Sequence, residues 1–145
     1  MGNNVQTMNR INFEDIQFLL HNPDKYIIIN TLGSNEQDCL IPNTIDPEKE
    51  IAIINQLLKT DSKYKYKYMK IIVYGKNSND DTIYKKYNQL LSLGFREVYV
   101  YTGGLFEWLL LQDIYGYKEF PTTKKELDIL RYKPRKMLNV SLLEY

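Results

Sequence analysis

The sequence contains very little cysteine and histidine, two residue types that often serve as nucleophiles, bases or metal ligands. It has one cysteine, Cys39, and one histidine, His21. A single cysteine excludes an internal disulfide, which fits a reducing compartment. The 19 basic and 18 acidic residues leave a formal net charge of +1, so we expect no general attraction to nucleic acid or to an anionic membrane surface.

Long apolar runs are also missing. No run approaches the length of a transmembrane helix, and the N-terminal stretch MGNNVQTMNR lacks the apolar core of a signal peptide. Gly2 raises the question of myristoylation, but Gln6 stands where that motif requires serine or threonine. The 145 residues are the length of one domain. We therefore expect a single cytoplasmic domain that does not bind a membrane.

The most informative stretch of the sequence is residues 69–111, around which the predicted fold is arranged. The β-branched run Ile71-Ile72-Val73 is typical of a strand that is covered on both faces. Asp80 and Asp81 offer caps for a helix, whose apolar face is formed by Ile83, Tyr87, Leu90 and Leu91. The stretch predicts a β-α-β unit made of a strand over 70–74, a polar loop over 75–81, a helix over 82–93, a strand over 97–101 and a further helix over 105–111.

The order of these motifs resembles the second half of a rhodanese-like domain. The resemblance rests on the helix end Leu93-Gly94-Phe95, on the strand residues Glu97-Val98-Tyr99-Val100, and on the pattern Gly103, Gly104 and Trp108. Upstream, YIIIN at residues 26–30 resembles the first core strand of the family, and LIPNTI at 40–45 resembles its His-Ile-Pro-Gly-Ala-Ile segment. We take the resemblance to cover residues 12–112.

The resemblance implies a rhodanese-like fold that lacks the active-site cysteine of the family. Active rhodaneses carry a cysteine at the first position of the loop after the core strand, which is Gly75 here, or Asn77 when the loop is aligned from the helix side. The usual acidic, basic and histidine positions of the family correspond to Asn30, Leu32 and Leu40. The loop holds no Cys, His or Arg, since it consists of Gly75, Lys76, Asn77, Ser78, Asn79, Asp80 and Asp81.

The chemistry of the loop leads to the same expectation without the family. Sulfur transfer and phosphate-monoester cleavage on such a scaffold both need a thiolate nucleophile. Backbone amides at a helix N-terminus would still favour an anion, but Asp80 and Asp81 place like charge there. We therefore expect no catalysis, no cofactor and no metal.

Two alternatives stay open from the residues alone. An enzyme of altered chemistry, sulfurtransferase-like or phosphatase-like, would use Ser78 or Cys39 as its nucleophile, although no base stands near either residue in the sequence. The second alternative is a loop that binds and senses an anion without catalysis. His21 falls at the end of a predicted helix, where capping or solvation is its expected role.

The flanking regions complete the predicted organisation. We expect an N-terminal arm over 1–11, a rhodanese-like domain over 12–120 and a C-terminal extension over 121–145. The domain then begins with a helix capped by Asn12 and a strand over 26–31. A second helix starts at Asp46-Pro47, and its predicted buried stripe is Ile51, Ile54, Leu57 and Leu58.

The C-terminal extension carries two further expectations. Thr123 and Glu126 form a capping-box signature that predicts a helix over 124–130. Residues 131–145 mix basic and apolar side chains, so they either fold back on the domain or dock on a partner. The candidate partner-binding residues are Met137, Leu138, Val140, Leu142 and Leu143.

A run of alternating lysine and tyrosine occupies residues 63–68. Such a run can bind single-stranded nucleic acid, or it can be a strand or connector with tyrosines inward and lysines in water. We favour the second interpretation because no wider basic surface extends the footprint.

Together these patterns predict a single α/β domain, with a central, mostly parallel sheet, helices on both faces and a short C-terminal helical extension. The predicted function is a non-catalytic rhodanese-like module that binds protein or serves as a structural subunit of a larger assembly. A cytoskeletal or ciliary assembly is suggested only by the use of enzyme-dead domains as building blocks.

Overall fold

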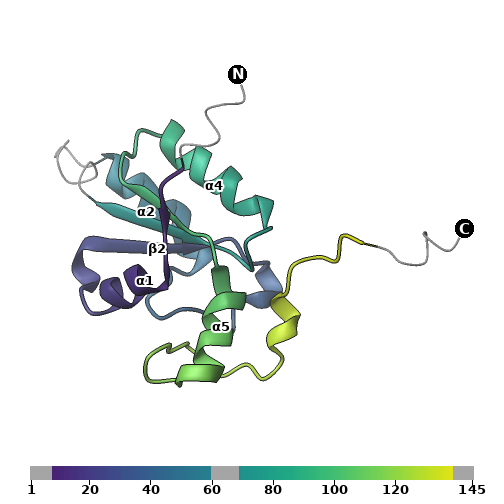
Figure 1. The fold of residues 1–145 in the computed structure, drawn as a ribbon. Coiled ribbons are helices and arrows are strands. Elements are labelled where there is room, and N and C mark those ends of the chain that lie inside the picture. Colours follow the sequence, from purple (N-terminus) through teal and green to yellow (C-terminus); the bar gives the residue numbers. More distant parts are fainter. Residues whose placement is uncertain (1–7, 60–68, 139–145) are drawn as a thin grey trace, which may run out of the picture.

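The computed structural model describes residues 8–59 and 69–138 of the chain. Within them, four strands form one sheet in the order β1-β4-β3-β2, and every pairing is parallel (Figure 1). The strands are β1 (Arg10–Ile11), β2 (Tyr26–Asn30), β3 (Lys70–Tyr74) and β4 (Val98–Tyr101). The lysine and tyrosine run at residues 63–68 lies outside the described residues.

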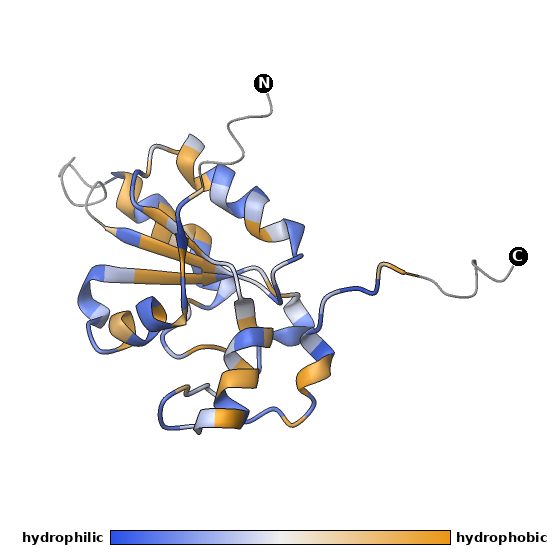
Figure 2. Cartoon of the chain, viewed as in Figure 1, coloured by the Kyte–Doolittle hydropathy of each residue, from blue (hydrophilic) through white to orange (hydrophobic). Residues whose placement is uncertain are grey.

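Helices cover both faces of this sheet, as predicted. Alternate residues of β3 point to opposite faces: Ile72 packs with α1 (Phe13–Leu20) and α5 (Gly104–Tyr115). Ile71 packs on the other face with α2 (Pro47–Lys59) and α4 (Asp81–Ser92). In Figure 2, β2 and β3 are coloured largely orange, and orange and blue segments alternate along α4. The α/β fold class is therefore confirmed.

The helix boundaries follow local signals. Asn12 caps α1, because its side chain accepts from the amides of Glu14 and Asp15. Gly94, with φ of 105°, follows the C-cap of α4. One predicted stripe was wrong in part, since Ile51 on α2 is 72% exposed while Ile54 is buried. Leu91, predicted on the apolar face of α4, is also exposed.

The N-terminal segment contributes to the sheet. Residues 1–11 were predicted to be an arm, but Arg10 and Ile11 pair in parallel with Val100 and Tyr101. The side chain of Asn9 also donates to the carbonyl of Val98, at 3.2 Å. The edge strand β1 therefore belongs to the sheet.

The C-terminal extension does not form the predicted helix over 124–130. The Thr123 hydroxyl accepts from the amide of Leu40 at 3.0 Å and donates to the carbonyl of Asp38, so it does not cap a helix. The helical turn is instead the 3-10 helix η4 (Ile129–Tyr132). Residues 121–132 thus fold back on the domain, and Tyr132 is fully buried.

The helices of the described residues are too short or too polar to cross a membrane.

Candidate functional site

The loop between β3 and α4 is stabilised by one of its own carboxylates. Oδ2 of Asp80 accepts from the amide of Lys76 at 3.1 Å, and Oδ1 accepts from the amide of Thr82, also at 3.1 Å. Asp80 is also the N-cap of α4. Two backbone amides of the kind that bind an anion at a helix N-terminus are therefore bonded to a carboxylate of the chain itself.

Gly75, the first residue of the loop, has no room for a side chain. A Cβ atom at this position would lie 2.5 Å from Asp80 Oδ2 and 2.8 Å from Ile83 Cγ1. A larger residue at this place requires the side chains of Asp80, Thr31 and Ile83 to shift. The glycine and the inward carboxylate are thus two parts of one arrangement.

Asn77, the alternative position for a nucleophile, is buried, and both polar atoms of its side chain are hydrogen-bonded. Its side-chain nitrogen donates to the carbonyl of Tyr132 at 2.8 Å, and its side-chain oxygen accepts from the amide of Asn79 at 2.9 Å. This side chain therefore connects the loop to the C-terminal extension, 55 residues away in the sequence.

The Gly-Gly motif allows α5 to begin directly against the loop. Gly104 has φ of +68°, and a Cβ there would lie 2.8 Å from both the amide nitrogen of Asn77 and the carbonyl oxygen of Gly75. The close approach lets the first amides of the helix bond to the loop: Leu105 donates to Gly75 at 2.9 Å and Phe106 donates to Lys76 at 2.8 Å. The N-terminus of α5 is therefore satisfied by loop carbonyls.

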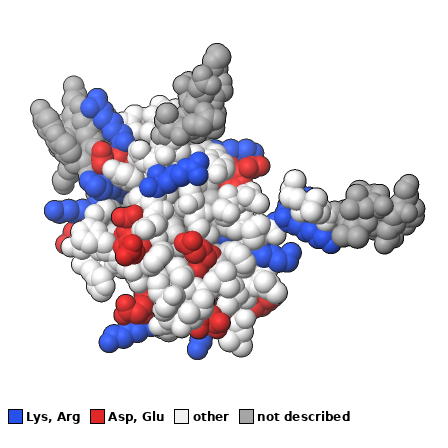
Figure 3. All heavy atoms as spheres, in the orientation of Figure 1, with Lys and Arg blue, Asp and Glu red and all other residues white. Residues whose placement is uncertain are grey.

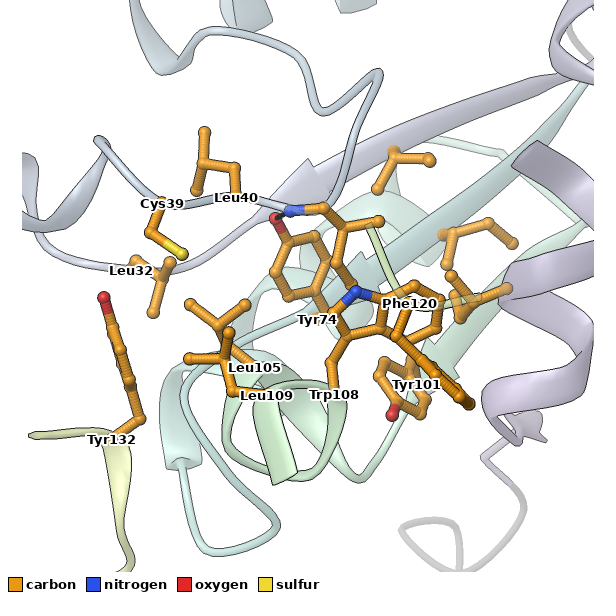
Figure 4. Packing of buried hydrophobic residues seen from close by; sticks show 14 of the residues in the cluster. Leu32, Cys39, Leu40, Tyr74, Tyr101, Leu105, Trp108, Leu109, Phe120 and Tyr132 are labelled. Carbon is orange, nitrogen blue, oxygen red and sulfur yellow. Dashed lines mark hydrogen bonds between the residues drawn. The ribbon is translucent and has the colours of Figure 1, made fainter. Parts of the chain in front are cut away.

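Trp108, the third residue of that motif, is a packing centre. Its ring is fully buried and makes edge-on contacts with Phe120 and Tyr101, with centroid distances of 5.0 and 6.2 Å. Its indole N–H donates to the carbonyl of Pro121 at 2.8 Å. Figure 4 shows this cluster on one face of the sheet. The motif thus fixes α5 against the loop at one end and against the C-terminal extension along its length.

Two buried tyrosines at this site were missed by the sequence analysis. Tyr74 ends β3, and its hydroxyl accepts from the amide of Ile41 at 3.2 Å and lies 2.8 Å from the hydroxyl of Thr44. Burial raises the pKa of Tyr74, so the phenol stays protonated. Tyr132 is the second, and Figure 4 shows its hydroxyl beside Leu32 and Cys39. The sequence carries no local signal for either contact.

The positions that differ from the family serve internal packing and hydrogen bonding. Asn30 accepts from the amide of Leu32 at 2.9 Å, and its side-chain nitrogen donates to Gln37 at 2.9 Å. Leu32 and Leu40 are buried in the cluster that contains Trp108. These side chains are therefore engaged in contacts within the domain.

The other candidate nucleophiles are placed separately. Cys39 is 1% exposed, its thiol donates to the carbonyl of Lys124 at 3.2 Å, and burial raises the pKa of this thiol. Ser78 is exposed on the loop, and His21 is the C-cap of α1. Within residues 8–59 and 69–138, no group of three His, Cys, Asp or Glu side chains forms a potential metal site.

A groove of about 800 Å³ opens on the outer side of the loop. One wall is formed by residues 76–81 with Tyr84, and the other by Lys133, Arg135, Lys136 and Met137. We call this the loop–tail groove. Of the predicted partner-binding residues, Met137 and Leu138 are 85% and 76% exposed. The other three, Val140, Leu142 and Leu143, lie outside the described residues.

Three solved structures with this fold come from bacterial proteins. The Alr3790 protein from Anabaena is 21% identical, with 83% of this chain and 86% of that chain covered and a TM-score of 0.55. The solution structure of the rhodanese-like domain of Alr3790 is 24% identical over 92% and 89% of the two chains, with a TM-score of 0.51. The BH2092 protein from Bacillus halodurans is 18% identical over 74% of each chain, with a TM-score of 0.54. These likenesses show the fold.

The family of this chain is shown by a match to a family model. A comparison with curated proteins gives no match. The model of the rhodanese-like domain matches residues 34–111, more than half of the chain, and this span includes the loop, the Gly-Gly turn and Trp108. The chain therefore belongs to the rhodanese-like domain family.

Proposed function

We propose that this protein is a non-catalytic rhodanese-like domain that acts by binding protein, as a module or a structural subunit of a larger assembly. The observation that carries the proposal is the position of the Asp80 carboxylate, which accepts from the amides of Lys76 and Thr82 at the loop. A thiosulfate or phosphate that approached these amides would have to displace a covalently attached anion of the same sign.

The loop also lacks a nucleophile in either alignment. Gly75 has no side chain, and the Asn77 side chain is bonded to Tyr132 and Asn79. A persulfide needs a thiolate, and neither position provides one. The family includes sulfurtransferases, so the proposal is that this chain retains the fold without that activity.

An enzyme with a displaced nucleophile fits these contacts less well. The Cys39 thiol is buried and its pKa is raised, which opposes the thiolate form. The Ser78 hydroxyl has no hydrogen bond to a base among the described residues. Activation of either group would need a base that reaches it, as nucleophilic catalysis requires.

A protein-binding role draws support from the C-terminal segment. Met137 and Leu138 expose most of their apolar side chains, and both adjoin the basic residues of the loop–tail groove. We place the protein in the cytoplasm as part of the same proposal, with a cytoskeletal or ciliary assembly as one setting.

The variant Asp80→Ala tests whether the carboxylate occupies an anion cradle. We expect this change to cost about 1 kcal/mol, because the N-cap of α4 is lost. Thiosulfate should then raise the melting temperature of the variant and leave that of the wild type unchanged, because the two amides become free. Asp81→Ala is the matched control, since it removes a neighbouring exposed carboxylate and should gain no response to thiosulfate. Stabilisation of the wild type by thiosulfate would contradict the proposal.

The binding role is tested by gentle affinity purification of the tagged full chain from its own cells, followed by native mass measurement. Recovery in a stoichiometric complex is the expected result. Recovery as a free monomer under these conditions would contradict a role as a structural subunit.

A further inference from the structure

We propose that the loop–tail groove binds an acidic, extended segment of a protein partner, an inference that rests on the protein-binding role and names its ligand class. The groove combines a wall with an excess of basic side chains, an extended backbone and a volume of about 800 Å³. Its two walls are joined at one point by the hydrogen bond from Asn77 to the carbonyl of Tyr132. The loop and the tail therefore form one surface.

The basic side chains of the tail have no acidic partner in the described part of the chain. Lys133, Arg135 and Lys136 make no ion pair there. Ion pairs do hold Lys70, Lys76, Lys86, Lys124 and Arg131, whose partners are Glu97, Glu36, Glu50, Asp38 and Glu126. Figure 3 shows blue side chains where the described tail leaves the body. Three uncompensated cations within four residues attract a ligand of negative charge.

The acidic residues of the groove limit what that ligand can be. The Asp80 carboxylate is bonded to two amides, whereas the Asp81 carboxylate is exposed on the loop wall. A nucleic acid carries a phosphate at every step and would place charge against this carboxylate. An acidic peptide can direct its carboxylates to the tail and a neutral residue to Asp81. The charge distribution therefore favours a peptide.

The backbone of the tail suits an extended ligand. Residues 134–138 form neither helix nor strand, and no backbone hydrogen bond involves them within the described residues. Their free amides and carbonyls are the groups with which an added strand pairs, except at Pro134, which has no N–H. An extended stretch of five residues reaches roughly 13 Å, so several ligand residues fit alongside it. Met137 adds an exposed apolar side chain to the same wall.

A fluorescent decapeptide in which glutamate alternates with serine tests this proposal on the full chain, because it offers neutral residues to the wall that holds Asp81. We expect saturable binding that weakens as salt rises, because the contacts are between charges. The double variant Arg135→Glu and Lys136→Glu should lose at least tenfold in affinity. The matched control is Lys25→Glu with Lys125→Glu, which makes the same change in net charge at exposed lysines outside the groove and should bind as the wild type does.

Each other outcome counts against the inference. No binding up to about 1 mM peptide, or equal loss in the groove and control variants, would overturn it. So would equal binding of the same decapeptide with glutamine in place of every glutamate, or tighter binding of a single-stranded oligonucleotide or of phosphatidylserine vesicles. Failure here is distinct from failure of the proposed function. A partner that is captured equally by the groove variant would keep the binding role and remove the groove, whereas sulfur transfer by the chain would remove the proposed function itself.

Discussion

Two tyrosines in the same core cluster differ in what surrounds the hydroxyl group. The hydroxyl of Tyr74 accepts from Ile41 and bonds to Thr44, whereas the hydroxyl of Tyr132 is buried with no hydrogen-bond partner among the described residues. A buried polar atom without a partner costs stability, while a bonded one contributes. The two residues are therefore a matched pair for mutation to phenylalanine.

We expect Tyr74→Phe to destabilise the protein by about 1–3 kcal/mol, because it leaves the Ile41 amide buried without its acceptor. Tyr132→Phe removes only an unpartnered hydroxyl, so we expect a change between zero and a gain of about 1 kcal/mol. Urea unfolding followed by circular dichroism measures both. Equal losses in the two variants would show that the Tyr132 hydroxyl has a partner.

Alkaline pH gives a second test at the residue scale. Burial raises the pKa of Tyr132 to about 12, above the ordinary value near 10 of an unfolded chain. The native state then holds its proton more tightly than the unfolded state. The contribution of this group to the free energy of unfolding should therefore be fully present below about pH 10. It should be lost between about pH 10 and 12, by up to about 1.4 kcal/mol per pH unit.

The control for this pH dependence is Tyr132→Phe, whose free energy of unfolding should fall less steeply over the same interval. Tyr74 and Tyr101 keep part of the slope in the variant, because burial raises the pKa of both. Parallel curves for wild type and variant would contradict the assignment of a raised pKa to Tyr132.

Among the helices and strands, α5 depends most on glycine, because a glycine stands at each of its ends and one of them packs against the loop. Gly104 and Gly116 stand at the two ends of this helix, and both have positive φ, +68° and +108°. A Cβ at Gly104 would meet backbone atoms at 2.8 Å, whereas a Cβ at Gly116 would meet nothing within 4 Å. The pair separates backbone strain from close approach.

We expect Gly116→Ala to cost about 1–3 kcal/mol from backbone conformation alone, and Gly104→Ala to cost more. Gly104→Ala should also speed hydrogen exchange at the amides of Leu105 and Phe106, because the helix must move away from the loop carbonyls. Urea unfolding and amide exchange by NMR measure the two effects. Unchanged exchange at these amides would contradict the role given to the close approach.

Helices and strands with a local apolar pattern could be predicted from the sequence, whereas those defined by distant contacts could not. The strand over 70–74 and the helices around it were predicted because their apolar periodicity is local. Strand β1 was missed because two residues have no periodicity and are defined by their partner strand. The helix at 124–130 was wrong because the Thr123 hydroxyl bonds to Leu40, a residue distant in the sequence.

The candidate site divides in the same way. The loop composition and the Gly103, Gly104 and Trp108 motif could be read from the sequence, and the capping role of Asp80 was expected. The bond from Asn77 to Tyr132 and the groove that it supports depend on residues brought together by folding. No local pattern carries such contacts.

At the scale of the whole molecule, the C-terminal extension is divided in two. Residues up to Tyr132 complete the core, since Pro121 accepts from Trp108 and Tyr132 is buried. Residues 133–138 are mostly exposed and line the groove. The extension therefore serves folding in its first part and binding, by our proposal, in its second.

Two shortened chains test this division. A chain that ends at Lys133 should keep nearly the full free energy of unfolding, because it retains the core contacts. A chain that ends at Phe120 should lose more than about 3 kcal/mol or fail to fold, since it removes the Pro121 carbonyl that accepts from Trp108 and the buried Tyr132. Thermal unfolding by circular dichroism compares them. Similar melting temperatures would contradict the division.

We propose that this rhodanese-like domain does not transfer sulfur. The most direct measurement incubates the full chain with thiosulfate, and separately with mercaptopyruvate, and records acceptor turnover together with the intact mass. We predict no turnover and an unchanged mass. Turnover accompanied by a mass gain of one sulfur atom, with both effects abolished by Cys39→Ala, would contradict the account and identify the buried cysteine as the nucleophile.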